Sequence, residues 1–210
     1  MDPKPVYFFL FDGLVDYEPA FALTAINNPQ FQRQPGRYKI VTFSLTGAAV
    51  VTAGGLRIQP DLALADIDPA RAAILILPGG AAWENGGNME AVEFGKAVLS
   101  NGGAVAAICG ATLGLAKAGL LDERRHTSNA PPYLTASGYR GAAHYVDEAA
   151  VTDRAIITAG AVFPTDFARH VARRLDLYAE PVEAAWYGLI KTGDRKFFFD
   201  LLKLTSGQPT

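Results

Sequence analysis

A segment in the middle of the chain reads Gly102-Gly-Ala-Val-Ala-Ala-Ile-Cys109-Gly-Ala-Thr-Leu-Gly-Leu-Ala-Lys-Ala-Gly119. The short apolar run at 104–108 follows two glycines, which predicts a buried strand rather than a core helix. Residues 111–118 are small and helix-compatible and stop before a glycine, which predicts a helix. Cys109, the only cysteine of the chain, therefore stands at a sharp turn from a strand into a helix.

Apolar runs of the same kind recur on both sides of this segment. They lie at residues 6–11, 38–44, 73–77 and 155–158, and helix-like segments lie at 17–27, 88–100 and 111–118. Continuous apolar strands alternating with helices indicate a parallel sheet covered on both faces, because each strand is buried on both sides. The predicted fold is α/β, an open, doubly wound and mostly parallel sheet with helices on both faces.

Three further features refine this prediction. Glycines and valines at 46–60 predict a β-hairpin that turns at Gly54-Gly55, and residues 145–158 predict a second hairpin near the edge of the sheet. Apolar residues repeat every four positions from Phe163 to Leu175, which predicts an amphipathic helix on the sheet. We expect a single domain over 1–210, in which 181–210 form a helical, aromatic-rich extension that caps the domain or joins a dimer interface.

Composition excludes several classes of protein. Of the 210 residues 50% are hydrophobic and 19% charged, with a formal net charge of −2, which is typical of a globular protein and gives no electrostatic argument for nucleic acid. We expect no secretory signal, no membrane-spanning helix and a cytoplasmic location. A single cysteine excludes an internal disulfide, and three histidines without spaced carboxylates predict no metal site and no cofactor.

The candidate chemical groups follow the ends of predicted strands, where reactive residues gather in this architecture. Glu18 begins the first helix, Gly79-Gly80 follows the strand at 73–77, Cys109 follows the next strand, and His126 lies in a later polar segment. Each has a structural alternative: a first-turn helix acid, a turn signal, a buried small hydrophobe and a loop histidine, respectively. At a helix N-terminus, however, a cysteine meets N–H groups that favour a thiolate and stabilise an oxyanion.

Taken in order, the motifs are specific. They are Phe11-Asp12-Gly13-x-x-Asp16-x-Glu18, Leu77-Pro78-Gly79-Gly80, Ala107-Ile108-Cys109-Gly110-Ala111 and His126-Thr127. This set resembles the DJ-1/PfpI superfamily, which is related to class I glutamine amidotransferases, and is most similar to its bacterial amidotransferase-like branch, over about residues 6–179. The resemblance implies a flavodoxin-like fold and a homodimer. It also implies a protonated Glu18 beside the sulfur of Cys109, with His126 approaching from a neighbouring loop.

The sequence also departs from the better-known members of that superfamily. PfpI-type peptidases carry a histidine directly after the cysteine, where this chain has Gly110. Class I amidotransferases carry a late His-x-Glu pair, and residues 158–164 contain neither residue. The isocyanide hydratase branch has an aspartate near the Glu18 position and a Cys-Thr corner, which are also missing. The chain therefore lacks a complete protease or glutaminase triad.

The sequence is compatible with three functions. The first is a cysteine-nucleophile enzyme acting on a small carbonyl or amide-like substrate, by glyoxalase-type or small-amide chemistry. Cys109 would attack, backbone N–H groups among Gly79, Gly80 and Gly110 would hold the oxyanion, Glu18 would move a proton, and His126 would assist. The second is a non-catalytic sensor of oxidative stress with an oxidisable, low-pKa Cys109. The third is a scaffold whose aromatic tail binds a partner.

The substrate pocket of such an enzyme needs walls. We expect them from Tyr17, Trp83, Tyr133 or the aromatic residues of the tail.

Overall fold

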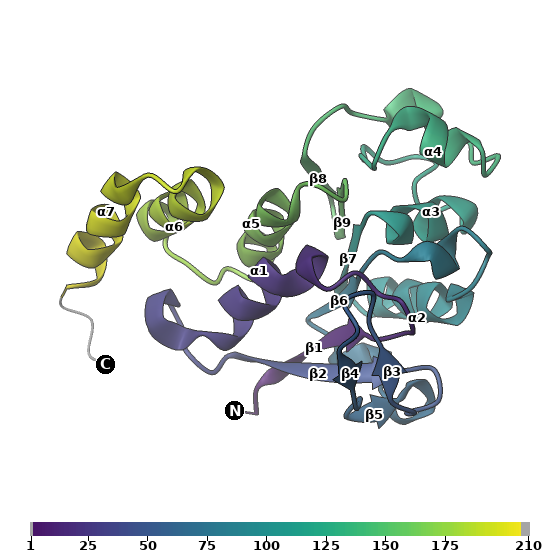
Figure 1. The fold of residues 1–210 in the computed structure, drawn as a ribbon, viewed down its shortest axis with the longest axis horizontal. Coiled ribbons are helices and arrows are strands. Elements are labelled where there is room, and N and C mark those ends of the chain that lie inside the picture. Colours follow the sequence, from purple (N-terminus) through teal and green to yellow (C-terminus); the bar gives the residue numbers. More distant parts are fainter. Residues whose placement is uncertain (1, 207–210) are drawn as a thin grey trace.

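A computed structural model describes residues 2–206 of the chain, built around one large sheet (Figure 1). The strands of this sheet are β1 (Lys4–Phe9), β2 (Tyr38–Ser44), β5 (Leu62–Ala63), β6 (Ile74–Leu77), β7 (Ala104–Ile108), β8 (Ala150–Asp153) and β9 (Ile156–Ala159). Their order is β5-β2-β1-β6-β7-β9-β8, and every neighbouring pair is parallel except β8 and β9. The predicted α/β fold is therefore confirmed.

The centre of the sheet shows why the apolar runs predict it. Leu75 of β6 lies in register with Tyr7 of β1 and with Val105 of β7. All residues of β6 and β7 are buried, as strands covered on both faces require. β1 begins at Lys4 and ends two residues before its predicted end, and beyond it the Gly13 N–H donates to Val51 O at 2.8 Å.

Helices cover both faces of the sheet (Figure 1). α1 (Tyr17–Asn27) and α5 (Pro164–Arg174) pack against each other on one face, and α2 (Met89–Ser100) and α3 (Gly110–Lys117) contact β7 on the other. Short helices lie in the connections: α4 (Pro131–Thr135), η1 (Pro29–Phe31), η2 (Leu64–Asp66), η3 (Pro69–Arg71), η4 (Ala81–Trp83) and η5 (Ala142–His144). The helix predicted from the four-residue apolar repeat is α5.

The predicted hairpin at 46–60 is present as β3 (Val50–Val51) paired with β4 (Arg57–Ile58). It is tied to the segment that links β1 to α1. The Val51 N–H donates to Asp12 at 2.8 Å, and the Gly54 N–H donates to Asp16 at 2.7 Å. These bonds hold the start of α1, and with it Glu18, in a fixed position.

The C-terminal segment forms α6 (Glu180–Thr192) and α7 (Arg195–Thr205). Trp186 of α6 packs against Tyr178 with a ring-centroid distance of 5.2 Å, so this part of the tail joins the core of its own chain. In α7 only Leu201 is buried, whereas Phe198 and Phe199 are exposed. The reading of 1–210 as one domain stays a prediction, and its last four residues lie outside the described part.

None of the helices within residues 2–206 has both the length and the apolar character needed to cross a membrane.

Candidate active site

Cys109 occupies a strained turn between β7 and α3. Its φ of 57° and ψ of −126° place a non-glycine residue in a sparsely populated region of backbone space. The turn is held because the Cys109 N–H donates to Ala159 O at 3.0 Å, and the Thr112 hydroxyl donates to Cys109 O at 2.6 Å. The predicted strand-to-helix corner is therefore real, and its side chain is only partly buried.

Glu18 lies in the first turn of α1 and is fully buried. The Gly79 N–H donates to its Oε2 at 2.6 Å. Its other oxygen, Oε1, has no hydrogen-bond partner among the described residues, and no described cation forms an ion pair with the carboxyl group. A buried carboxyl group with an unpaired oxygen is costly, which is typical of a group kept for chemistry.

Gly79 brings the two side chains together. A Cβ placed on Gly79 would lie 2.6 Å from Cys109 Cβ, 2.6 Å from Glu18 Oε2 and 2.9 Å from the sulfur. Every side chain larger than hydrogen would therefore collide with both groups at once. The glycine after β6 allows the carboxyl group and the thiol to share one small space.

The two groups change each other's proton affinity. Burial raises the pKa of Glu18 to about 7, against the opposing effects of hydrogen bonds with Cys109 and the Gly79 N–H. Burial, and next the charge of Glu18, raise the pKa of Cys109 to about 11. The expectation of a lowered thiol pKa is therefore wrong, because desolvation and a neighbouring carboxylate outweigh the helix N-terminus. The resting site holds a thiol beside a carboxyl group that titrates near neutrality.

Backbone N–H groups suited to an oxyanion lie beside the sulfur. A Cβ on Gly110 would lie 2.9 Å from Gly80 O and 3.4 Å from Gly80 N, so these two glycines are in direct contact. Within residues 2–206, the Gly80 N–H donates to no protein group, and Gly110 begins α3, where N–H groups have no helical partner. Gly79 differs from the prediction, because its N–H is already committed to Glu18.

His126 is not brought to the sulfur. Its ring is fully buried, Nδ1 bonds with Arg124 O at 2.7 Å, and Nε2 bonds with the Tyr139 hydroxyl at 3.1 Å. Burial lowers its pKa, and Tyr139 and Tyr145 both pack edge-on against the ring. Because both ring nitrogens are occupied, His126 makes no described bond to Cys109 or Glu18. The role predicted for it at the thiol is not supported, and the histidine instead stabilises its own loop.

Asn129 takes the place expected for His126. Its Nδ2 donates to the sulfur of Cys109 at 3.5 Å, while its Oδ1 accepts from the Ala161 N–H at 2.9 Å. The second bond fixes the orientation of the amide, so its NH₂ group faces the sulfur. The sequence analysis missed this residue, which lies three positions after His126 in the same polar loop. No signal in a single sequence shows which side chain of that loop faces the thiol.

Two of the expected aromatic walls lie near the reactive pair. Burial raises the pKa of Tyr17, and the charges of Glu18 and Cys109 raise it further. Burial and next the charge of Glu84 raise the pKa of Tyr133, with smaller contributions from the charges of Cys109 and Glu18. Tyr17 is 54% exposed, so it can contact an incoming molecule. Trp83 is fully buried and donates to a backbone carbonyl, so it supports the site from behind.

The described residues contain no group of three or more His, Cys, Asp or Glu side chains placed to hold a metal ion. The candidate site is therefore built from one thiol, one carboxyl group, one amide and backbone N–H groups.

The sequence model of the DJ-1/PfpI family matches residues 4–174, and the chain belongs to that family. The resemblance found in the motifs is thereby confirmed.

Individual relatives cover different shares of the chain. A Bacillus subtilis protein called the uncharacterized protease YoaZ is 34% identical over 205 residues, which are 96% of this chain and 98% of the relative. A Pyrococcus abyssi protein named a deglycase is 35% identical over 92 residues, 43% of this chain and 55% of the relative. The crystal structure of a ThiJ/PfpI family protein from Bacillus anthracis superposes with a TM-score of 0.88 at 32% identity, covering 97% of each chain.

Proposed function

We propose that the chain is a cysteine-nucleophile enzyme that acts on a small carbonyl or amide-like substrate. Relatives named as a protease and a deglycase support a hydrolase-like enzyme in general. The observation that carries the proposal is the buried Glu18, which lies beside the only thiol of the chain. One of its carboxyl oxygens, Oε1, is unpaired, and its pKa is raised to about 7. A group that both accepts and donates protons near pH 7 is what general acid–base catalysis needs.

The first step follows from this pairing. The sulfur of Cys109 attacks the carbonyl carbon, the thiol proton passes to the Glu18 carboxylate, and the carbonyl π-electrons move to the oxygen. The N–H groups of Gly80 and Gly110 stabilise that oxyanion. The amide of Asn129 donates to the sulfur, so it opposes the rise in thiol pKa and orients the nucleophile. No histidine takes part in this scheme.

The fate of the adduct depends on the substrate. With an aldehyde, protonated Glu18 returns its proton to the oxyanion and gives a neutral hemithioacetal. With an amide, Glu18 gives the proton to the departing nitrogen and leaves a thioester, which water then hydrolyses. With a dicarbonyl such as methylglyoxal, proton transfers through the Glu18 carboxylate then convert the hemithioacetal into an α-hydroxy thioester, in which one carbon is oxidised and its neighbour reduced, and water hydrolyses this thioester to the hydroxy acid. Hydrolysis of the thioester ends both routes and returns Glu18 and Cys109 to their starting states.

The test is a turnover panel with methylglyoxal, glyoxal and small primary amides, including glutamine. We expect turnover of at least one aldehyde or amide, and its loss in Cys109→Ser. The control is Ser206→Ala, which removes a hydroxyl near the C-terminal end of α7. The proposal fails if Cys109→Ser keeps the wild-type rate, or if the wild type turns over no member of the panel.

One observation favours a second function, a sensor of oxidants. Cys109 is the only thiol and is partly exposed, and a protonated Glu18 could donate to an oxidised sulfur. Peroxide would oxidise the thiol to a sulfenic acid and itself be reduced to water. Mass measurement after mild peroxide treatment tests this function. Added oxygen on Cys109, together with no turnover of the panel, would favour the sensor over the enzyme.

The homodimer and the cytoplasmic location expected from the sequence belong to the same proposal. Sedimentation velocity at several protein concentrations tests the dimer.

A further inference from the structure

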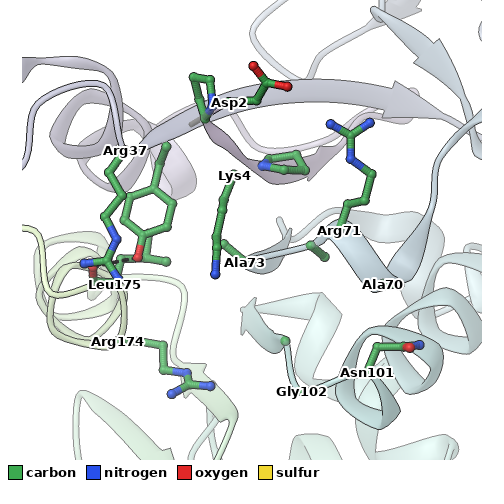
Figure 2. A pocket seen from close by; sticks show the side chains of 15 residues that line it. Asp2, Lys4, Arg37, Ala70, Arg71, Ala73, Asn101, Gly102, Arg174 and Leu175 are labelled. Carbon is green, nitrogen blue, oxygen red and sulfur yellow. Dashed lines mark hydrogen bonds between the residues drawn. The ribbon is translucent and has the colours of Figure 1, made fainter.

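A cavity lies at the amino-terminal ends of the parallel strands, whereas Cys109 lies at their carboxyl-terminal ends. This cavity has a volume of about 510 Å³ and is lined where strands begin, by Lys4 of β1, by Tyr38 of β2 and by Gly103 just before β7 (Figure 2). Cys109 follows the other end of β7. Because these strands are parallel, the cavity and the candidate active site lie at opposite ends of the same strands.

The lining of the cavity carries more positive than negative charge. It includes four cations, Lys4, Arg37, Arg71 and Arg174, against one carboxylate, Asp2. Figure 2 shows Lys4 between Arg71 on one side and Arg37 with Arg174 on the other. The whole chain has a formal net charge of −2, so this surplus is a local concentration and not a general property of the surface.

Most of this charge has no protein partner. Lys4, Arg71 and Arg174 form no ion pair with any carboxylate in the described part of the chain. Arg37 approaches Asp176 at 3.9 Å, but another arginine already bonds that carboxylate at 2.8 Å. Lys4, Arg71 and Arg174 are therefore available to a ligand, and Arg37 has only a long contact with a carboxylate that it shares.

A structural explanation accounts for only part of the cluster. Arg174 lies in the last turn of α5, where a cation balances the negative end of the helix. Lys4 and Arg37 lie on no helix, and Arg71 ends a helix of three residues, whose dipole is small. Helix capping thus explains one of the four positions. The convergence of the other three, from separate segments, needs another reason.

We propose that this cavity binds a small free anion with at least two negative charges, of the class of diphosphates and phosphate esters. Its volume lies within the usual range for small-molecule sites, and its concave shape favours a small molecule over a flat membrane surface. Arginine and lysine are the side chains that recognise phosphate oxygens. Because all four cations are exposed, binding weakens as salt rises.

Titration calorimetry with sodium pyrophosphate tests the proposal. The titration is done at low ionic strength and at about 0.15 M salt, because salt screens the attraction between the exposed cations and the anion. We expect saturable binding at low salt and at least about tenfold weaker binding in Lys4→Gln/Arg174→Gln, since two nearby opposite charges are lost. The control is Arg57→Gln/Arg195→Gln, which removes the same charge from exposed positions outside the cavity. Circular dichroism checks that each variant is folded, and Arg71→Gln alone provides a second, milder variant.

Several results would overturn this proposal. They are the absence of binding at low salt, equal weakening in the cavity and control variants, and unchanged affinity in both Lys4→Gln/Arg174→Gln and Arg71→Gln. Co-sedimentation with phosphatidylglycerol vesicles without pyrophosphate binding would also overturn it, because that result would assign the charge to a membrane surface. None of these outcomes depends on the activity of Cys109.

Discussion

Two buried carboxyl groups in this protein sit in nearly the same position of two helices and behave in opposite ways. Glu18 lies in the first turn of α1, and Asp166 lies in the first turn of α5, which packs against α1. Burial raises the pKa of Glu18 to about 7. For Asp166, burial acts in the same direction, but hydrogen bonds from Lys191 and Tyr187 outweigh it and lower the pKa.

The difference lies in the partners and not in the burial. Asp166 bonds with Lys191 and accepts from the Tyr187 hydroxyl at 2.8 Å, and both partners belong to α6. Glu18 meets one backbone N–H and a thiol, and one of its oxygens is unpaired. A buried acid with a cation serves as a fixed structural contact, whereas a buried acid without one can exchange its proton near pH 7.

The largest expected effect is on turnover, which should depend on Glu18 and not on Asp166. With a substrate found in the panel described above, Glu18→Gln should lower kcat/KM by about 10²- to 10⁴-fold, because an amide cannot take the thiol proton. The matched variant Asp166→Asn should stay within about threefold of the wild type, since Asp166 contacts no group of the site. Steady-state kinetics decide this point. Equal losses in the two variants would remove the distinction between a catalytic and a structural acid.

Stability against pH should separate them next. Moving the pKa of Glu18 from its ordinary 4.5 to about 7 costs the folded state roughly 3 kcal/mol once the group is ionised in both states. The folded protein holds this proton more tightly, so stability falls as pH rises from 4.5 to about 7. Glu18→Gln should remove this decline and be more stable than the wild type at pH 8.

Urea unfolding at pH 5 and pH 8 measures the effect in both proteins. A wild-type stability that rises over this interval relative to Glu18→Gln would contradict the raised pKa.

Asp166 should show the opposite sign. Asp166→Asn at pH 7 should destabilise the protein by about 2 kcal/mol, because the buried carboxylate loses its charge and its hydrogen bonds with Lys191 and Tyr187 weaken. Since the pKa of Asp166 is lowered, its contribution is present above its ordinary value of 3.8 and is lost as pH falls through the folded value. Thermal unfolding at pH 7 measures it, with the exposed Asp2→Asn as control. A change in Tm no larger than that of the control would show that α6 is held by other contacts.

The smallest effects concern the thiol. Glu18→Gln should speed alkylation of Cys109 by iodoacetamide at pH 8, because removing a like charge lowers the thiol pKa. Asn129→Asp should slow it by about fivefold, because a donor to the sulfur is lost and a negative charge is gained, while Oδ1 can still accept from Ala161. The exposed Asn28→Asp is the control. Alkylation that is faster in Asn129→Asp would show that the amide does not face the sulfur.

Much of the fold could be predicted because each strand of the sheet centre is buried and is therefore a run of consecutive apolar residues. The predicted and observed limits agree for β2, β7 and α1, where an apolar run or a helix start is visible in consecutive residues. The Cys109 corner and the position of Glu18 also followed from strand ends, since parallel strands deliver their carboxyl ends to one edge. The tail was harder to place, because α6 packs against the core through Trp186 while most of α7 faces outward.

The choice between His126 and Asn129 could not be made from the sequence. Both lie in one polar loop, and the histidine is the more familiar catalytic residue. In the structure, the Arg124 carbonyl bonds to the ring of His126, and two tyrosine rings pack against it. The Ala161 N–H donates to Oδ1 of Asn129, which orients the NH₂ group of this amide towards the sulfur. The basic cavity was equally hidden, because its four cations come from separate segments of the chain.

The sequence by itself determined the succession of strands and helices along the chain, the glycine turns and the corner that carries Cys109, because these depend on neighbouring residues. Only the tertiary structure decided the chemistry of that corner. The Glu18–Gly79 bond joins residues 61 positions apart, and Asn129 reaches Cys109 across 20. Proton affinity depends on desolvation and on charges a few ångströms away, and that distance is set by folding and not by position along the chain.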